Sequence, residues 1–418
     1  MTPLGPGLRR RAQTSLDRAK HNVAAVLSGD LDRLDRYMAF ILPLVFASFF
    51  VLPKTPQRTL IYLTCLLPMV LYVRPAVFRA VRREPVWWLT TGLCALWLAS
   101  VAWSANLTHE SVFDTVRVGL AVALFVHASI WLALQGKLPH RRILTAILAT
   151  AAIFGTLTIL LALLPGWEMS QDGRLVGFGW AGHAGIGGDI YAFAGLIALA
   201  GLTETRDRRR AGLLTAVLVM CAFYTVLSES RGAVLAFASA AFVCTVLARP
   251  RHVLTLAGVL ALAGLGAQAS GLVDLGTWIA RGASHRIDIW LDALAKVAAN
   301  PVLGLGAADV TPIDAGAVSF NSAHNIFVAM AMDLGALGLA LFTALSALAV
   351  WRAWTIFRAG RGALLLTLLA FAYGVMLLHT QTVLLMPARE WLIFWLPLLM
   401  LVQEHATDTP RAVPAGVR

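Results

Sequence analysis

Apolar segments long enough to cross a lipid bilayer recur along this chain from Tyr37 to Val402. A transmembrane helix needs about 20 consecutive, mostly apolar residues. Of the 418 residues, 59% are hydrophobic and only 13% are charged, whereas a soluble domain carries about 25% charged residues. No segment of ordinary domain size remains for a soluble fold. The sequence therefore predicts an all-α polytopic membrane protein.

The apolar segments predict about twelve transmembrane helices. They are expected near residues 37–52, 59–73, 86–103, 112–134, 143–164, 183–203, 211–228, 232–247, 253–271, 324–351, 362–386 and 390–402. This pattern divides the chain into an N-terminal tail (1–36), helices one to nine (37–271), a helical extramembrane segment (272–323), helices ten to twelve (324–402) and a C-terminal tail (403–418).

Basic residues gather in alternate turns between the predicted helices. The turns after even-numbered helices hold groups such as Arg82 and Arg83, or Arg208, Arg209 and Arg210, whereas the opposite turns hold scattered ones. Lys and Arg are enriched on the cytoplasmic side of membrane proteins. We therefore expect both termini in the cytoplasm and 272–323 on the outer side. The net charge of +12 then reflects orientation and contact with anionic lipid headgroups, not nucleic-acid binding.

Two further features refine this picture. The first 36 residues are polar and lack an apolar core followed by a small-residue cleavage site, so we predict no cleavable signal peptide. The four cysteines all lie within apolar segments and lack the paired spacing of a zinc or redox site. They are expected to be small, buried apolar residues. The four are Cys65, Cys94, Cys221 and Cys244.

Arginines on the outer side oppose the orientation signal, so each needs another explanation. Arg174 lies in a Gly-rich outer loop that runs through Gly182 and Gly188 into the sixth predicted helix. Glycines let backbone N–H groups approach an anion, and a helix N-terminus favours one. The loop is therefore a candidate anion-binding segment, and the alternative is a flexible loop whose arginine reaches toward the headgroups.

Arg231 lies in the short turn between the seventh and eighth predicted helices, in Ser228-Glu229-Ser230-Arg231. So short a turn places Arg231 at or inside the outer membrane boundary. An ionisable residue at that depth usually faces the bundle interior or a water-filled cavity. A structural ion pair with Glu229 is the alternative.

A further arginine begins an amphipathic helix in the 272–323 segment. Ile287, Trp290, Leu291 and Leu294 recur at helical spacing, and Asn300-Pro301 ends the helix. Asp292 and Lys296 are expected to pair on its polar side. Arg286 stands in the first turn, where the helix dipole disfavours a cation. This placement suggests an anionic partner, either Asp288 or a ligand. The helix is expected to lie flat on the bilayer or to cap the bundle.

His324 precedes the tenth predicted helix, in Asn321-Ser322-Ala323-His324-Asn325. Ser322 is a possible helix cap, and an ordinary interface role for His324 and Asn325 is the alternative. His324 is expected at the same depth as Arg231. Other histidines, such as His379, fall within apolar helices and are expected to be packed or hydrogen-bonded inside the bundle.

In this order, these elements resemble the O-antigen ligase and polymerase superfamily of bacterial envelope glycosyltransferases. The fragments that carry the resemblance are Arg174-Leu175-x-Gly177-Phe178, Ser230-Arg231-Gly232-Ala233, Arg286-x-x-x-Trp290-x-x-Ala293, Asn300-Pro301-x-x-Gly304-x-Gly306 and His324-Asn325. Each fragment alone is weak. The ordered set spans 174–325 of a chain with twelve predicted helices and a long outer loop before His-Asn, and is more specific.

The resemblance implies a glycosyltransferase-C-like bundle in the bacterial inner membrane, with a periplasmic active site. It implies a metal-independent, inverting transfer of O-antigen from undecaprenyl diphosphate to lipid A–core. Arg231 and Arg286 would bind the diphosphate and His324 would act as the base. The other substrate-binding candidates are Arg174, Trp290, Gly304, Gly306 and Asn325. Two guanidiniums can neutralise a diphosphate leaving group without a metal, and the outer segments contain no Asp-x-Asp pair. No cofactor is expected.

Other functions stay open at this point. An O-antigen polymerase and a protein O-oligosaccharyltransferase differ from a ligase mainly in the acceptor. A lipid or solute transporter would instead carry polar residues near the bilayer midplane and related halves, and the sequence shows few mid-helix charges and no convincing repeat. A membrane scaffold would leave Arg231, Arg286 and His324 replaceable.

Overall fold

The computed structural model describes residues 30–164, 170–171, 174–248, 285–316 and 318–408, with a few helical positions between 258 and 269. The longer helices are α2 (Leu31–Ala47), α6 (Pro85–Ala99), α7 (His109–Leu134), α8 (His140–Ala162), α9 (Ala184–Glu204), α10 (Arg208–Leu227), α11 (Arg231–Ala248), α14 (Arg286–Ala299), α15 (Ile326–Arg358), α16 (Leu364–His379) and α17 (Leu396–Asp408). Shorter helices are α3 (Lys54–Ile61), α4 (Leu67–Met69) and α5 (Pro75–Val81), and the single turns include η5 (Gly179–Gly182) and η6 (Trp391–Trp395). Two antiparallel hairpins pair β1 (Ser170–Gln171) with β2 (Arg174–Leu175), and β3 (Ile313–Ala315) with β4 (Val318–Phe320).

The prediction of an all-α polytopic membrane protein is confirmed. Within the described ranges, seven helices are long and apolar enough to cross a membrane. An eighth span results if Lys54–Tyr72 and Pro75–Val81, which meet at an angle of 90°, are counted as one. The total of twelve stays a prediction, since most of the expected ninth helix, 253–271, lies outside the described residues.

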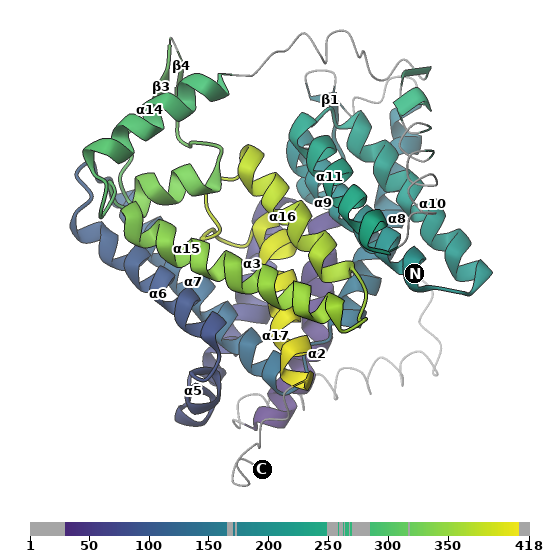
Figure 1. Cartoon of the computed structure of the whole chain (residues 1–418), viewed down its shortest axis with the longest axis horizontal. Coiled ribbons are helices and arrows are strands. Elements are labelled where there is room, and N and C mark those ends of the chain that lie inside the picture. Colours follow the sequence, from purple (N-terminus) through teal and green to yellow (C-terminus); the bar gives the residue numbers. More distant parts are fainter. Residues whose placement is uncertain are drawn as a thin grey trace, which may run out of the picture.

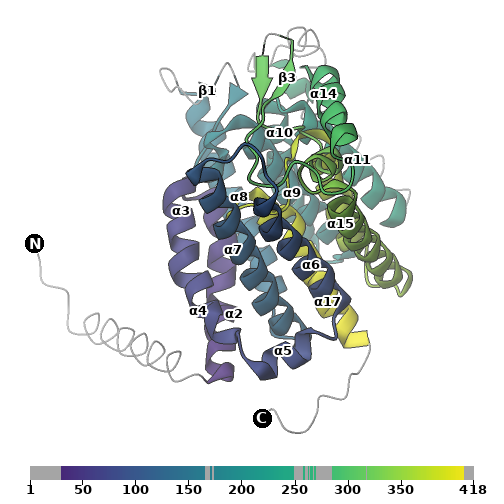
Figure 2. The ribbon, with the colours of Figure 1, turned by 90° about the vertical axis from the view of Figure 1, so that its left-hand side faces the viewer.

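The helices run between two ends of the molecule, and different extramembrane elements lie at each end. Figures 1 and 2 show α14 and the β3–β4 hairpin at one end, together with β1, whereas α5 lies at the other. The segment around α5 contains Arg74, Arg79, Arg82 and Arg83. The basic turn that was expected in the cytoplasm is therefore opposite the segment that was expected outside.

Helix α9 forms the centre of the bundle and positions much of the site. Its residues from Gly187 to Ala200 are all buried, and a helix that is apolar all round belongs in a core. Glycines allow neighbours to come close: a Cβ on Gly188 would lie 2.6 Å from the Ser228 hydroxyl, and one on Gly195 would lie 3.1 Å from the Cβ of Cys221. Helices α8, α10, α11 and α16 pack around α9.

Helix α15 is broken at Gly335, near its N-terminal end, and contacts with the loop that precedes the helix fix the geometry there. Gly335 adopts φ 63° and ψ −160°, a conformation that glycine reaches without steric cost. The loop after α14 fills the break, with Leu305 N–H donating to the Met332 carbonyl at 2.8 Å and Ala336 N–H to the Pro301 carbonyl at 2.9 Å. Irregular backbone at membrane depth is tolerated where protein satisfies its polar groups.

Several element boundaries differ from the sequence expectation. Helix α2 begins at Leu31 rather than near 37, because the Asp30 carboxylate caps it by accepting from Asp32 N–H at 3.0 Å. Helix α15 extends to Arg358 and α17 to Asp408, past the apolar stretches that mark the membrane. The four cysteines are buried, as expected.

Candidate functional site

His324 occupies a strained turn immediately before α15. Its backbone has φ 49°, a left-handed conformation that costs a non-glycine residue free energy and often marks a functional position. The His324 N–H donates to the Ser322 hydroxyl at 3.1 Å. The Asn325 side chain caps α15 by accepting from Phe327 N–H at 3.0 Å and Val328 N–H at 3.3 Å. These bonds fix the backbone of His324 at the N-terminal end of α15.

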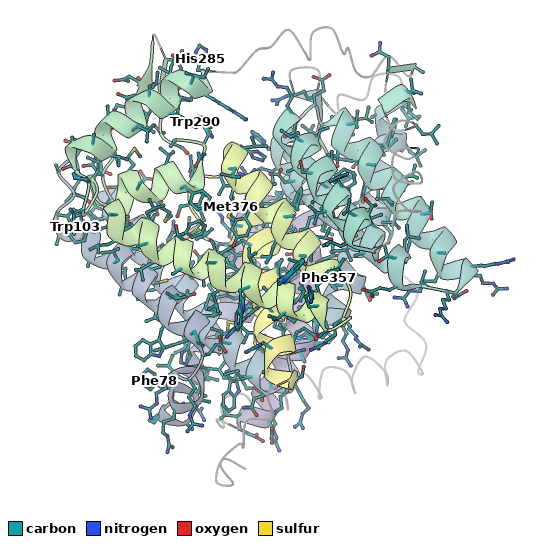
Figure 3. The ribbon with its side chains drawn as sticks, in the orientation of Figure 1. Phe78, Trp103, His285, Trp290, Phe357 and Met376 are labelled. Carbon is teal, nitrogen blue, oxygen red and sulfur yellow. The ribbon has the colours of Figure 1, made fainter. Side chains whose placement is uncertain are left out.

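Helix α14 brings Arg286 to the same turn. The Trp290 indole N–H donates to the Ala323 carbonyl at 3.0 Å, which joins the helix directly to the residue before His324. Trp290 and His285 are labelled on α14 in Figure 3. Arg286 is half-buried one turn before Trp290. The link between α14 and α15 therefore places the first arginine of the helix near the histidine.

The predicted helix, its end before Asn300 and the Asp292–Lys296 pair are confirmed in α14, which ends at Ala299. The Asp292 carboxylate also accepts from Asp314 N–H at 3.0 Å, which holds the β3–β4 hairpin. Ile289 and Ala293 are buried against the protein. The apolar residues that stay exposed are Ile287 at 62%, Leu291 at 63% and Leu294 at 50%.

Arg231 begins α11 after a tight turn in which Glu229 is buried and has φ 47°. The next residue, Gly232, lies against the imidazole of His379: a Cβ added at position 232 would be 2.5 Å from the His379 Nδ1 atom. Only glycine permits this approach, because real Cβ atoms do not come so close to another heavy atom. The glycine therefore docks the start of α11, and with it Arg231, onto the end of α16.

The electrostatics connect the three residues that the sequence singled out. The positive charge of Arg231, together with burial as the larger effect, lowers the pKa of Arg286. Burial lowers the pKa of His324, and the charges of Arg286, His379 and Arg389 lower it further. Nearby positive charge disfavours the protonated imidazole. His324 is therefore held in its neutral form, in which a ring nitrogen can accept a proton.

The buried carboxylate of Asp189 binds His379 and Arg389, two of the residues whose charges act on His324. Asp189 is fully buried in α9, and its carboxylate accepts from His379 Nε2 at 2.8 Å and from Arg389 Nη1 at 2.5 Å. Arg389 also donates through Nε to Glu390 at 2.9 Å and through Nη2 to the His379 carbonyl at 2.9 Å. All three guanidinium nitrogens are thus engaged within the protein, and the network joins α9, α16 and the segment before η6.

A second group of cations lies beside this network. Lys54 Nζ and the Arg58 guanidinium lie over the Trp180 ring, 5.6 Å and 5.5 Å from its centroid. His183, just before α9, has a pKa lowered first by burial and then by the charges of Lys54, Arg174 and Arg389. Arg174 therefore belongs to this second group, while Arg389 acts on both His183 and His324.

The predicted substrate-binding residues Gly304 and Gly306 lie against protein backbone. Gly304 has φ 70°, and a Cβ there would meet the α15 backbone within 2.6 Å. Gly306 has φ 95°, and a Cβ there would lie 2.1 Å from the Ser104 hydroxyl. Both glycines shape the loop that fills the break in α15. A direct contact of these glycines with substrate stays a prediction.

Five residues of this region are not among the site residues predicted from sequence: Asp189, His379, Arg389, Lys54 and Arg58. Asp189 and His379 each sit inside an apolar segment, and an ionisable residue in a membrane helix is by itself a signal of function. The pairing partner lies 190 residues away in sequence. His379 is hydrogen-bonded within the bundle, as expected. In the described part of the chain, no three His, Cys, Asp or Glu side chains are grouped so as to hold a metal ion.

The fold and the site define an integral membrane protein with arginines and histidines gathered at one end of a helical bundle. A family model described as O-antigen ligase matches residues 216–343, which contain Arg231, Arg286 and His324. A curated protein of Pseudomonas aeruginosa named O-antigen ligase is 26% identical over 398 residues, which cover 93% of this chain and 94% of that protein. Both comparisons support the resemblance of this chain to the O-antigen ligase superfamily, and that similarity points to a glycosyltransferase-like activity.

Proposed function

We propose that this protein is an O-antigen ligase of the bacterial inner membrane. It transfers an O-antigen polysaccharide from undecaprenyl diphosphate to a sugar hydroxyl of lipid A–core on the periplasmic side. The proposal rests on one observation above all: Arg231, Arg286 and His324, which are far apart in sequence, act electrostatically on one another in a short chain at one end of the bundle. The similarity to a protein named O-antigen ligase supports it.

The chemistry follows from the charge states of these groups. Neutral His324 removes the proton from the acceptor hydroxyl as its oxygen bonds to the anomeric carbon of the donor sugar. The bond from that carbon to the phosphate oxygen breaks, and the electron pair leaves with undecaprenyl diphosphate. Attack on the face opposite to the leaving group inverts the configuration. No oxidant, reductant or further reactant is needed.

The arginines supply the electrostatic part of the reaction. Negative charge grows on the diphosphate as the glycosidic bond breaks, and preorganised guanidiniums at that place stabilise it. Arg231 and Arg286 are proposed for this role, since their mutual repulsion is relieved when an anion binds between them. The transfer is proposed to need no metal, because two arginines provide the positive charge.

The orientation is part of the proposal. The end of the bundle with α5 carries the basic turn and is placed in the cytoplasm, together with both termini. The end with α14 and the β3–β4 hairpin, and the whole 272–323 segment, are placed in the periplasm. This orientation puts His324 at the level of the outer-leaflet headgroups, where both lipid-linked substrates present their polar parts.

Complementation in cells tests the proposal. The gene is deleted and replaced by wild type, by His324→Ala or by the control His109→Ala, whose imidazole is exposed at the start of α7. Extracted lipopolysaccharide is then separated on a gel at equal protein level. Wild type and the control are expected to give a long-chain ladder, and His324→Ala to give bare core with accumulated lipid-linked polymer.

The other outcomes identify the alternatives. Core that carries a single repeat unit after deletion would make the protein an O-antigen polymerase. Loss of glycan from envelope proteins with normal lipopolysaccharide would make it a protein O-oligosaccharyltransferase. An unchanged ladder, in a strain with no second copy, would return a lipid or solute transporter to consideration.

A further inference from the structure

Two cations on α3 are separate from the proposed diphosphate group. Lys54 and Arg58 are one helical turn apart, and both lie over the ring of Trp180. Figure 2 shows the start of α3 at the end of the bundle that carries β1 and β3. The positive-inside tendency disfavours two cations on the outer side. Their presence there therefore calls for a reason other than orientation.

Neither cation has a carboxylate partner. Lys54 and Arg58 form no ion pair with any acidic side chain in the described part of the chain; the Arg58 Nε donates instead to the Pro387 carbonyl at 3.2 Å. The acids whose charges act on Arg58 are Asp114 and Glu390; Asp114 is paired with Arg117 and Glu390 with Arg389. The charge of Arg389 acts on Lys54, and that of Lys54 acts on His183. Like charges held together are costly unless an anion joins them.

Lys54 and Arg58 are distinguished from Arg231 and Arg286 by the residues on which their charges act. The charges that act on His324 are those of Arg286, His379 and Arg389, whereas those that act on Lys54 are Arg58 and Arg389. The charge of Arg389 therefore acts on both groups, whereas that of Arg286 acts on His324 and that of Arg58 on Lys54. If the diphosphate is bound by Arg231 and Arg286, the two cations of α3 are left for a different anion.

We propose that Lys54 and Arg58, supported by Trp180, form a second anion-binding site that holds a phosphate group of the glycolipid acceptor. This inference rests on the proposed function for the identity of the acceptor. Lipid A–core is a phosphorylated glycolipid of the outer leaflet, so its phosphates lie at the headgroup level, where α3 begins. Arg58 provides a planar fork for phosphate oxygens and Lys54 a flexible point charge. The site fixes the acceptor while its sugar hydroxyl reaches His324.

Binding of lipid A–core to the purified full-length protein in nanodiscs tests this site. The two probes are lipid A–core and the same molecule after enzymatic removal of its phosphates. Wild type is expected to bind the phosphorylated probe at least about tenfold more tightly, because charge-assisted hydrogen bonds to phosphate oxygens are stronger than neutral ones. The double variant Lys54→Gln/Arg58→Gln is expected to lose this preference, and Lys54→Arg to keep it.

A matched control is Lys296→Gln, which removes a lysine of α14 whose charge is already paired with Asp292. It is expected to keep the wild-type preference. Size-exclusion profiles and unfolding temperatures check that all variants are folded. A preference that persists in the double variant overturns the inference. Equal loss of binding for both probes also overturns it, since the residues would then act on structure and not on phosphate.

The source of the anion is decided by competition. Excess phosphatidylglycerol in the nanodisc is expected to leave the binding of phosphorylated lipid A–core unchanged; full displacement would make this a general headgroup site and overturn the acceptor assignment. Transfer activity is measured separately. A folded wild type that binds with the preference but transfers nothing would refute the proposed function alone. Active variants with an unchanged acceptor KM would refute the second site alone.

Discussion

The two ends of the bundle treat charge in opposite ways. At the end with α5, Arg352 and Glu84 form a fully buried ion pair at 2.6 Å, and Lys137 is held by Asp32 and Asp35, each at 2.7 Å. At the other end, Arg286 and Arg231 repel each other. Balanced pairs hold helices together, whereas gathered positive charge prepares a site for an anion.

The second cation group extends this contrast. The charges of Arg58 and Arg389 both act on Lys54. Only Arg389 is neutralised from within, by Asp189 and Glu390. At the opposite end, by contrast, the buried Arg352 and the half-buried Lys137 each have a carboxylate partner. The difference indicates that function maintains the positive end at some expense of stability.

The largest effect, a loss of stability, is expected when the buried Arg352–Glu84 ion pair is broken. Glu84→Ala leaves Arg352 buried without its partner, and removing one member of a buried pair destabilises a protein by about 3–5 kcal/mol. Unfolding in a denaturant series in detergent micelles measures this loss. The exposed Glu110 provides the control Glu110→Ala. A variant of Glu84 with wild-type stability would show that the pair contributes nothing. Molecules that remain folded are expected to keep their transfer rate.

Arg286→Gln is expected to slow transfer without loss of stability, which is the reverse of the effect of Glu84→Ala. Loss of one preorganised donor to developing charge lowers a rate by about 10²–10³-fold, while stability stays at the wild-type level or rises as repulsion from Arg231 is removed. Single-turnover transfer from lipid-linked donor, with unfolding measured on the same sample, gives both quantities. A destabilised variant with a normal rate would assign Arg286 to structure and erase the contrast between the ends.

Gly232→Ala tests the contact between α11 and α16. A methyl group at this position would lie 2.5 Å from the His379 ring, and overpacking of this kind costs about 1–3 kcal/mol. The displaced helix start carries Arg231, so transfer is expected to slow together with the loss in stability. Gly258→Ala, at a position open to added atoms, is the control. If the variant behaves like wild type, the close approach of the two helices is not needed.

The smallest expected effect is the pH dependence of the transfer rate. Burial and the charges of Arg286, His379 and Arg389 lower the pKa of His324 below its ordinary value. The neutral form is the active base, so transfer rises with pH through this pKa and the acid limb lies below about pH 6.5. Rates at saturating substrate between about pH 5 and pH 8 measure it. A midpoint above the ordinary value would mean that nearby acids, rather than cations, dominate.

Much of the local structure could be predicted from sequence. Helix α14, its end before Asn300 and the Asp292–Lys296 pair follow from i, i+4 spacing and a helix-stopping Asn-Pro. The same pattern did not reveal which apolar residues of α14 face the protein. Ile289 and Ala293 are buried while Leu291 is exposed, because the Trp290 and Asp292 hydrogen bonds fix the rotation of the helix against the protein.

The sequence by itself determined that this chain is a helical membrane protein and which outer arginines and histidine need explanation, because apolar length, charge asymmetry and motif order are local properties. Only the tertiary structure decided how these residues meet. Asp189 joins His379 and Arg389 across 190 and 200 residues of chain, and Trp180 lies beneath Lys54 and Arg58. Such contacts depend on which helix faces pack together, and no spacing within a single segment encodes that choice.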